Sequence, residues 1–402
     1  MIPPPPPSAD ADEPTRCWAE IDLAALRHNV AVAREAAGAG ADVLAVVKAD
    51  AYGHGLAPVA RELFAACGVR RFGVANVREA AVLQTVLPPG DVEITLLSPA
   101  LPHERAEVVR RGLLPWVSSL AEVEDYARLA RSRADGAPVE IEINVDTGMG
   151  RDGVLAADYD ALRRAVAALP GVRVQGIATH LPSPDEDEAY TVAQLAGFEQ
   201  LLSSPLPVPA DTADAATSPL PGRRHAQNSA GLLGYPLAAG CNLVRPGLML
   251  YGSSPLPSLQ ARLRPVLTLR TSLSLVRELP AGHGVSYGRT FVTPRPMRVG
   301  TLAAGYGDGY PRRLSHTGAA VLVRGRRCPV LGRVTMDQTM IDLSGLPADV
   351  DAGEEAVLLG RQGEEEIPAA ELATRAGTIA WEIFTGLTAR VGRRYVRQRA
   401  EG

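Results

Sequence analysis

Residues 43–55 read VLAVVKADAYGHG, an apolar run that ends in a lysine and is followed by a loop with two glycines. The run is short and rich in valine, which is typical of a buried β-strand. Lys48 is the single lysine among the 41 basic residues, and the other 40 are arginine. Arginine stays protonated in proteins, whereas lysine can lose its proton and act as a nucleophile. Lys48 is therefore either a reactive amine at the C-terminal end of a strand or a chance survivor in an arginine-biased chain, and the surrounding motifs decide between the two.

Further short apolar runs alternate with helical patterns along the first two thirds of the chain. The predicted strands are Val43–Val47, Phe72–Ala75, Ile94–Leu97, Leu114–Val117, Val139–Val145, Val174–Thr179, His225–Asn228 and Leu243–Arg245. The predicted helices between them are Pro58–Cys67, Val77–Leu87, Ala121–Ser132, Ala157–Leu169 and Glu188–Leu202. Eight strands separated by helices predict an α/β fold, a (β/α)₈ barrel of the TIM type over residues 16–260.

The rest of the chain has a different pattern. Residues 1–15 are proline-rich and predict a disordered tail, and residues 203–224 predict a proline- and alanine-rich insertion in the barrel. After residue 260, short apolar runs are bounded by Gly and Pro turns, with one predicted helix at Ala369–Ala376. Residues 261–402 therefore predict a C-terminal, mostly β domain.

Composition excludes several classes of protein. The net charge of −4 and the absence of a basic stripe argue against a nucleic-acid-binding surface. The four cysteines are far apart and form no CxxC pair, so neither a disulfide framework nor a metal site is indicated. No apolar run reaches transmembrane length, and the first residues lack the pattern of a signal peptide. These features predict a cytoplasmic protein without membrane contact.

Polar residues follow several of the predicted barrel strands. Enzymes with this fold place catalytic groups at the C-terminal ends of their strands. The candidates there, beside Lys48 and Tyr52, are Arg151 in DTGMGR, His180, Asn228, Ser229, Arg245, Gly247 and Leu248. The loops after the seventh and eighth strands usually bind phosphate through backbone N–H groups and a hydroxyl, and Ser229, Gly247 and Leu248 fit that role.

The C-terminal domain carries three more motifs, GVSYGRTF at 284–291, GYGDGYPR at 305–312 and GRVTMDQ at 332–338. Tyr287, between small residues, is a candidate for a second acid/base group opposite the lysine. Taken in order with AVVKADAYGHG, DTGMGR and VRPG, these motifs closely resemble the alanine racemase family from about Trp18 to Tyr395. The family consists of pyridoxal 5′-phosphate (PLP) enzymes with a (β/α)₈ barrel and a C-terminal β domain.

The resemblance implies a role for each candidate. Lys48 would hold PLP as a Schiff base and act as the base on one face of the substrate. Tyr287, from the other subunit of a homodimer, would be the base on the opposite face. The phosphate would be held by Tyr52, Asn228, Ser229, Gly247 and Leu248. Arg245 would face the pyridine nitrogen, and His180 would link Arg245 toward Tyr287.

The substrate contacts are implied in the same way. Arg151 would orient the cofactor oxygen and the substrate carboxylate, while Met336, Asp337 and Tyr306 would come from the partner subunit. Racemisation removes a weakly acidic Cα proton and returns one to the other side, so it needs an electron sink and two opposed acid/base groups. An arginine against the pyridine nitrogen keeps that nitrogen unprotonated, which should disfavour side reactions.

Two positions depart from the family pattern. Many relatives have a carbamate-bearing lysine where this chain has Asn144, and the single lysine of the chain excludes a carbamate. We expect the neutral amide to support Arg151 instead, with a possible chloride nearby. Near the C-terminus the family usually has a tyrosine before a glutamate, whereas this chain has Trp381. The larger indole predicts a reshaped substrate pocket.

Three functions remain in competition. The first is an alanine racemase that supplies D-alanine for peptidoglycan. The second, motivated by Trp381, is a racemase of the same fold with a preference for serine or with broader specificity. The third is a PLP-binding protein without turnover, against which Tyr287 and the β domain argue. His54 and His225 are interpreted as turn and supporting residues.

Overall fold

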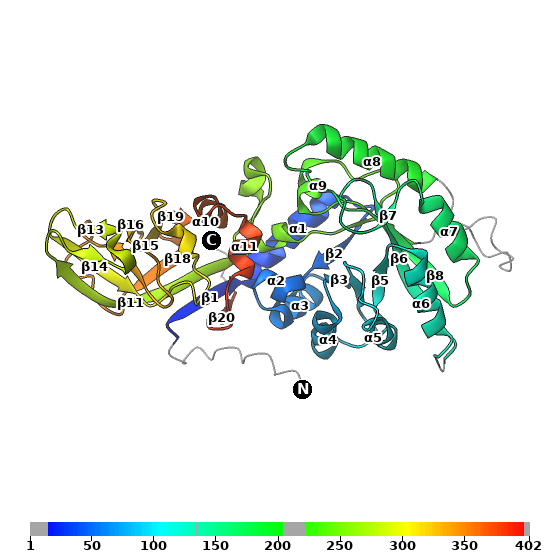
Figure 1. Ribbon diagram of the computed structural model, residues 1–402, viewed down its shortest axis with the longest axis horizontal. Helices are drawn as coiled ribbons and strands as arrows, with labels where there is room; N and C mark the ends of the chain where they lie inside the picture. The colour runs from blue at the N-terminus through cyan, green and yellow to red at the C-terminus, as the bar shows by residue number, and fades with distance from the viewer. Residues whose placement is uncertain (1–14, 134, 204–221, 398–402) are drawn as a thin grey trace.

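The computed structural model describes residues 15–133, 135–203 and 222–397 and contains two large sheets (Figure 1). The predicted tail lies outside these residues except for Thr15, and most of the predicted insertion also lies outside them. Within the described ranges, no helix has the length and apolar character needed to cross a membrane.

The first sheet is parallel and forms the predicted barrel. Its strands occur in the order β10-β2-β3-β4-β5-β6-β8-β9, and the short β7 (Val154–Leu155) pairs with β6. Their bounds are β2 (Asp42–Val46), β3 (Arg71–Val74), β4 (Glu93–Leu96), β5 (Leu114–Val117), β6 (Val139–Asp146), β8 (Val172–Ala178), β9 (Arg223–His225) and β10 (Leu243–Val244). Backbone bonds from Asn242 N to Arg224 O and from Arg245 N to Gln227 O, both 3.0 Å, bring β9 and β10 together. All eight predicted strands are present, so the barrel prediction is confirmed.

Helices pack around the barrel strands (Figure 1). They are α1 (Leu23–Ala37), α3 (Leu56–Ala65), α4 (Val77–Val86), α5 (Arg105–Arg111), α6 (Leu120–Ala130), α7 (Tyr159–Ala167) and α8 (Glu188–Ser203). Side-chain caps fix several of their starts: Asn76 Oδ1 accepts a hydrogen bond from Glu79 N, and Ser119 Oγ accepts one from Glu122 N. These capped helices begin a few residues after the preceding strand ends, so the loops that connect strand to helix are short.

The second sheet forms the C-terminal domain, on the left in Figure 1. Its order is β19-β18-β15-β16-β17-β14-β11-β1-β20. The bounds are β1 (Cys17–Asp22), β11 (Leu267–Leu279), β14 (Met297–Leu302), β15 (Ala320–Val323), β16 (Arg326–Leu331), β17 (Thr339–Asp342), β18 (Glu355–Gln362), β19 (Glu365–Ile367) and β20 (Gly392–Val396). The helices α10 (Ala369–Ala376) and α11 (Ala380–Thr385) and the hairpin β12 (Gly284–Val285) and β13 (Phe291–Val292) complete the domain.

One strand lies on the other side of the predicted domain boundary. The predicted barrel segment 16–260 includes β1, but β1 pairs antiparallel with β11 and parallel with β20 in the second sheet. Cys17, Trp18, Ala19 and Ile21 are all buried there, because β11 and β20 cover both edges of the strand and the β domain covers its apolar residues. Within the described residues, the chain therefore passes from the second sheet at β1 through the barrel and back to the second sheet at β11.

Candidate active site

Lys48 begins an unusual turn directly after β2. The following residues form the short helix α2 (Lys48–Tyr52), in which Ala49, Asp50, Ala51 and Tyr52 all have φ between 53° and 55°. Left-handed helical backbone costs about 1–2 kcal/mol per non-glycine residue, so consecutive residues of this kind persist only when their surroundings fix them. The position of the lysine is therefore set by the contacts of this turn.

Hydrogen bonds from neighbouring elements hold the turn. Glu79, on α4, accepts bonds from Ala49 N at 2.9 Å and from Ala75 N at 2.8 Å, one on each carboxylate oxygen. The ring of His54 is buried, and its Nδ1 lies 2.8 Å from Tyr52 O. His54 is thus a turn residue, as the sequence interpretation has it.

The C-terminal domain of the same chain also contacts this turn. Gly53 has φ 77°, and a Cβ atom there would lie 2.2 Å from Phe384 O, so only glycine lets α11 approach this closely. Arg393 Nε donates to Gly53 O at 3.2 Å, and Tyr395 Oη donates to His54 O at 3.1 Å. The lysine-bearing turn is therefore fixed by both domains.

The electrostatic environment favours a neutral amine at Lys48. Burial lowers the pKa of Lys48 below its ordinary value, and the guanidinium of Arg151 lowers it further, with Glu79 acting in the opposite direction. Burial also lowers the pKa of His180 far below its usual value, and Arg245, Arg151 and Lys48 contribute to that shift. The structure therefore brings these four predicted site residues into one electrostatic neighbourhood.

Arg245 follows β10 and is buried inside the barrel. Its Nη1 donates to His225 Nδ1 at 2.6 Å and to His225 O at 3.0 Å. Its Nη2 donates to Thr179 O at 2.6 Å and to Ala226 O at 3.0 Å, and lies 3.3 Å from His180 Nδ1. Since a guanidinium has five N–H donors, these bonds occupy the terminal nitrogens and leave the Nε–H for another acceptor.

A buried carboxylate, Glu142, contacts the histidine to which Arg245 donates. Glu142 Oε2 accepts from Trp116 Nε1 at 2.8 Å and lies 3.2 Å from His225 Nε2. Burial alone would raise the pKa of Glu142, but the nearby His225 and the hydrogen bonds outweigh it and the pKa is lowered. Burial lowers the pKa of His225, and the donor Arg245 Nη1 lies 2.6 Å from its Nδ1, a contact that requires the neutral ring. The neutral ring donates from Nε2 to the carboxylate and accepts at Nδ1 from Arg245.

The predicted phosphate-binding residues converge at the ends of β2, β9 and β10. Ser229 Oγ accepts from Gly247 N at 2.9 Å, and Asn228 Oδ1 caps the short helix α9 (Ser229–Gly234) by accepting from Gly231 N. A Cβ atom at Gly247 would lie 2.5 Å from Tyr52 Oη, so only glycine lets that hydroxyl approach the backbone this closely. Leu248 is buried in the following 3₁₀ turn. The hydroxyls of Tyr52 and Ser229 thus meet at Gly247, and hydroxyls and backbone N–H groups are the donors that a phosphate group needs.

Arg151 lies in the tight loop between β6 and β7. The Asp146 carboxylate accepts bonds from Gly148 N, Met149 N and Gly150 N, which folds the DTGMGR segment. The expected support of Arg151 by Asn144 is indirect in the structure. Asn144 Nδ2 donates to Asp152 Oδ1 at 3.1 Å, and the same oxygen lies 3.5 Å from Arg151 Nε.

Most site candidates of the β domain are exposed in the single chain. Tyr287 is 71% exposed in the 3₁₀ turn between β12 and β13, and β13 is at the end of the domain far from β2 (Figure 1). Tyr306 and Met336 are also exposed, at 39% and 52%. The carboxylate of Asp337 pairs with Arg390, and Trp381, on α11, packs partly buried against the core. The structure therefore does not bring Tyr287 to Lys48 within one chain, whereas α11, which carries Trp381, packs against the lysine-bearing turn.

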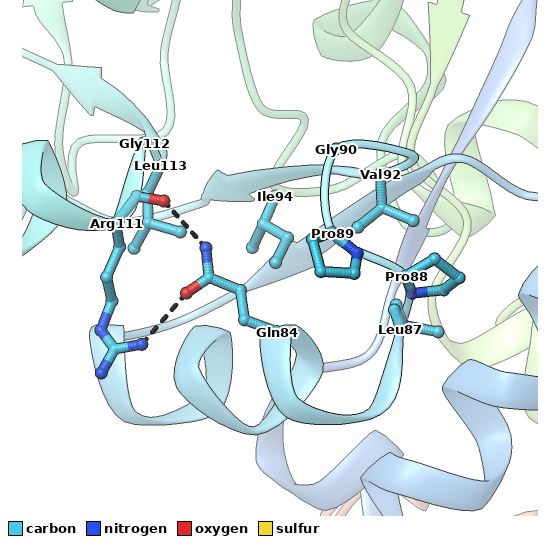
Figure 2. A pocket seen from close by; sticks show the side chains of 10 residues that line it. All are labelled: Gln84, Leu87, Pro88, Pro89, Gly90, Val92, Ile94, Arg111, Gly112 and Leu113. Atoms are coloured by element: carbon cyan, nitrogen blue, oxygen red, sulfur yellow. Dashed lines mark hydrogen bonds between the residues drawn. The ribbon is translucent and has the colours of Figure 1, made fainter.

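A cavity of about 280 Å³ lies elsewhere on the barrel (Figure 2). It is lined by residues at the N-terminal ends of β4 and β5 and at the ends of α4 and α5, including Ile94 and Leu113. Gln84 and Arg111 line the cavity and form two hydrogen bonds with each other. Gln84 Nε2 donates to Arg111 O at 2.8 Å, and Arg111 Nη1 donates to Gln84 Oε1 at 3.0 Å. This cavity is at the opposite end of the strands from Lys48, so it does not belong to the candidate site.

Sequence reasoning missed three acidic residues of this site: Glu79, Glu142 and Asp152. One signal was available for Glu142, because a glutamate inside an apolar strand, VEIEINVD at 139–146, is rarely buried without a partner. Glu79 and Asp152 occur in ordinary helix and loop contexts and carry no such signal. Their role depends on contacts between segments that are distant in sequence or on loop geometry.

Comparisons with known proteins agree with this geometry. Residues 21–255 match the family described as alanine racemase, N-terminal domain, and residues 266–395 match alanine racemase, C-terminal domain. The chain is 42% identical over 393 residues to the alanine racemase of Symbiobacterium thermophilum, covering 96% of this chain and 98% of that protein.

Solved structures show the same likeness. The alanine racemase from Streptomyces coelicolor A3(2) superposes with a TM-score of 0.85 at 40% identity, covering 97% of this chain and 100% of that one. The alanine racemase from Bartonella henselae with covalently bound pyridoxal phosphate gives a TM-score of 0.83 at 29% identity, covering 95% and 100%. Sequence and fold therefore resemble the same group of proteins over nearly the whole chain.

Proposed function

Because this chain belongs to the alanine racemase family, we propose that it interconverts L-alanine and D-alanine with PLP through Lys48 and Tyr287. It is a PLP-dependent isomerase. The observation that carries the assignment of residues is the clustering of Lys48, His180 and Arg245 at one end of the barrel, with the pKa of Lys48 lowered by burial and by Arg151.

The residues at the strand ends fit the cofactor. Tyr52, Ser229, Gly247, Leu248 and Asn228 would hold its phosphate, because the hydroxyls of Tyr52 and Ser229 meet at the Gly247 backbone. The Nε–H of Arg245, left free by the bonds of its terminal nitrogens, would face the pyridine nitrogen. When bound, PLP supplies the electron sink that makes the substrate Cα–H acidic enough to remove.

Two groups would then move the proton at Cα. The neutral amine of Lys48 would accept it on one face, which its lowered pKa favours at neutral pH, and the ammonium formed would return it in the reverse direction. Tyr287 of the partner subunit serves the other face, and the neutral ring of His180 links that hydroxyl to Arg245. Arg151 holds the substrate carboxylate, with Met336 and Tyr306 of the partner subunit enclosing it.

This division of roles requires a homodimer with shared sites. Tyr287, Tyr306 and Met336 are exposed in the single chain, so their side chains are free to meet a second copy. A second copy of the chain would bring them to the barrel of its partner. Asp337 accepts a hydrogen bond from Arg390, and this bond would hold the segment that carries Met336 in position.

The cell location and the use of the product complete the proposal. The described residues contain no helix able to cross a membrane, and we place the enzyme in the cytoplasm, where D-alanine for peptidoglycan is needed. Trp381 favours a second candidate, a racemase that accepts serine or a broader range of substrates, because an indole changes the shape of the pocket compared with the usual phenol. A PLP-binding protein without turnover is the third.

One experiment separates these candidates. The purified holoenzyme is incubated with single L-amino acids in heavy water, the enantiomers are resolved, and deuterium at Cα is measured. Deuterated D-alanine as the leading product supports the alanine racemase, and D-serine as the leading product supports the second candidate. An absence of exchange with every amino acid would contradict both.

A further inference from the structure

Arg151 has a carboxylate partner directly beside it in sequence. Asp152 Oδ1 lies 3.5 Å from Arg151 Nε, and the Arg151 side chain is 46% exposed in the single chain. A long, exposed arginine loses considerable rotamer freedom when it is held in one orientation. An anion beside its Nε reduces that cost, since it selects the orientation before substrate binds.

Asp152 is held in place by a buried residue of the barrel. Asn144 is 2% exposed on β6, and its Nδ2 donates to Asp152 Oδ1 at 3.1 Å. The next residue, Gly153, donates its N–H to Ser118 Oγ at 2.9 Å, and β7 then pairs in parallel with the end of β6. The loop therefore returns to its own strand and sets the carboxylate between a buried amide and the arginine.

The contacts of Asn144 and Asp152 also disfavour a bound chloride beside Arg151. The Nδ2 donor of Asn144 is already directed to a carboxylate, and the remaining polar atom of the amide, Oδ1, is a buried acceptor without a partner in the structure. A chloride beside Asp152 would meet like charge and a lone pair in a partly buried setting, which is unfavourable.

We propose that Asp152, held by Asn144, is a positioning residue that supplies the anion needed to orient Arg151 toward the substrate carboxylate, in place of a bound chloride. The inference rests on the proposed function, in which Arg151 binds that carboxylate. It assigns Asn144 a specific task, which is to hold an aspartate and not the arginine itself. Asp152 touches neither substrate nor cofactor and acts through Arg151.

The test measures KM and kcat for L-alanine with the holoenzyme in gluconate buffer and again with added chloride at constant ionic strength. The variants are Asp152→Ala, the isosteric Asp152→Asn and the conservative Asp152→Glu, with Asp158→Asn, an exposed aspartate of the following loop, as the matched control. PLP absorbance shows that each variant retains the cofactor, and the isosteric variant covers the case in which the alanine variant fails to fold.

We expect KM of Asp152→Ala and Asp152→Asn to rise about tenfold, as for loss of one charge-assisted contact, with a much smaller change in kcat. Asp152→Glu should recover part of the affinity, Asp158→Asn should match the wild type, and chloride should lower the KM of Asp152→Ala only. A wild-type KM that depends on chloride, an unchanged KM in both variants, or a raised KM that chloride leaves unaltered would each overturn the proposal. Failure of the wild type to racemise alanine would instead contradict the proposed function.

Discussion

Arg245 Nη1 and His225 Nδ1 lie 2.6 Å apart inside the barrel, and both side chains are buried. The contact is possible because His225 directs its other ring nitrogen to Glu142, which leaves Nδ1 as an acceptor. The orientation of the arginine beneath the cofactor site is thus tied to a carboxylate on β6, on the far side of the imidazole ring.

Substitution of Glu142 tests whether this carboxylate controls the orientation of Arg245. Glu142→Gln keeps one oxygen that can accept from Trp116 and His225 but removes the negative charge that Arg245 faces across the imidazole. We expect kcat for alanine to fall at least about tenfold and the free energy of unfolding to fall by about 1–3 kcal/mol, because the buried bonds are no longer charge-assisted and the buried guanidinium loses its counter-charge. Steady-state kinetics and thermal unfolding measure the two effects. Glu140→Gln, on the same strand with an exposed ion pair to Arg173, is the control, and equal kcat values for the two variants would refute the role of Glu142.

The pKa of Lys48 can be read from cofactor binding to the apoprotein. Only the neutral amine combines with PLP, so the association rate should rise with pH through a midpoint below the ordinary value of about 10.5. Arg151 lowers this pKa, so Arg151→Gln should move the midpoint upward and slow association at pH 7. Stopped-flow absorbance over a pH series gives the midpoints, and the exposed Arg131→Gln serves as control. A midpoint that stays unchanged in Arg151→Gln contradicts the shared electrostatic neighbourhood.

His54 makes the folded state sensitive to acid. Burial lowers its pKa to about 4 from 6.5, so between these values the unfolded chain binds a proton that the folded protein does not. The stability contributed by the neutral ring is therefore present above pH 6.5 and is lost as the pH falls toward 4, by up to about 3 kcal/mol. His54→Asn, which keeps a donor near the position of Nδ1, should flatten the decline of the melting temperature over this range. Parallel pH curves for the two proteins would exclude His54 as the source.

The left-handed turn predicts a stabilising substitution. Ala49 is exposed with φ 53°, a conformation that glycine adopts without steric cost. Ala49→Gly should raise the free energy of unfolding by about 1 kcal/mol, whereas the same change at the exposed Ala31 in the middle of α1 should lower it by a similar amount. Denaturant titrations of the three proteins measure both. A loss of stability in Ala49→Gly equal to that in the control would show that the turn is not strained at this residue.

Mixing two inactive variants tests the shared active site. Lys48→Ala lacks the amine and Tyr287→Phe lacks the phenol, so neither homodimer should racemise alanine. If Tyr287 serves the partner's barrel, random re-association gives hybrid dimers with one intact site, and about a quarter of wild-type activity should return. The activity is followed after unfolding and refolding of the mixture, with each variant refolded alone for comparison. No recovery in a mixture that contains hybrid dimers would place both residues in the same chain's site.

Much of the barrel could be predicted from the sequence because its strands are short, apolar and separated by helical periodicity. The residues at their C-terminal ends followed from the architecture, since parallel strands of a barrel end at one face. Lys48, His180 and Arg245 could therefore be selected without coordinates. Their hydrogen-bond partners could not, because a pattern of apolar residues does not specify which buried polar atoms meet.

Other features depend on contacts between distant parts of the chain. The left-handed turn after Lys48 is made of ordinary residues, ADAY, and is imposed by Glu79 from α4 and by α11 from the other domain. Asp152 follows Arg151 in a loop whose path is set by Asp146 and by the pairing of β7. The pairing of β1 could not be predicted either, because CWAEID suits either sheet and its partner strands are more than two hundred residues away in sequence.

The place of β1 has a consequence for how the protein is made. During synthesis Cys17–Asp22 emerges before the barrel strands, whereas both of its neighbours, β11 at Leu267–Leu279 and β20 at Gly392–Val396, emerge after them. The barrel strands can therefore pair while β1 has no neighbour, and one of its edges stays open until β20 is made. Separate expression of the barrel would keep that edge permanently open, and a split of the gene that respects the fold has to leave β1 with the C-terminal piece.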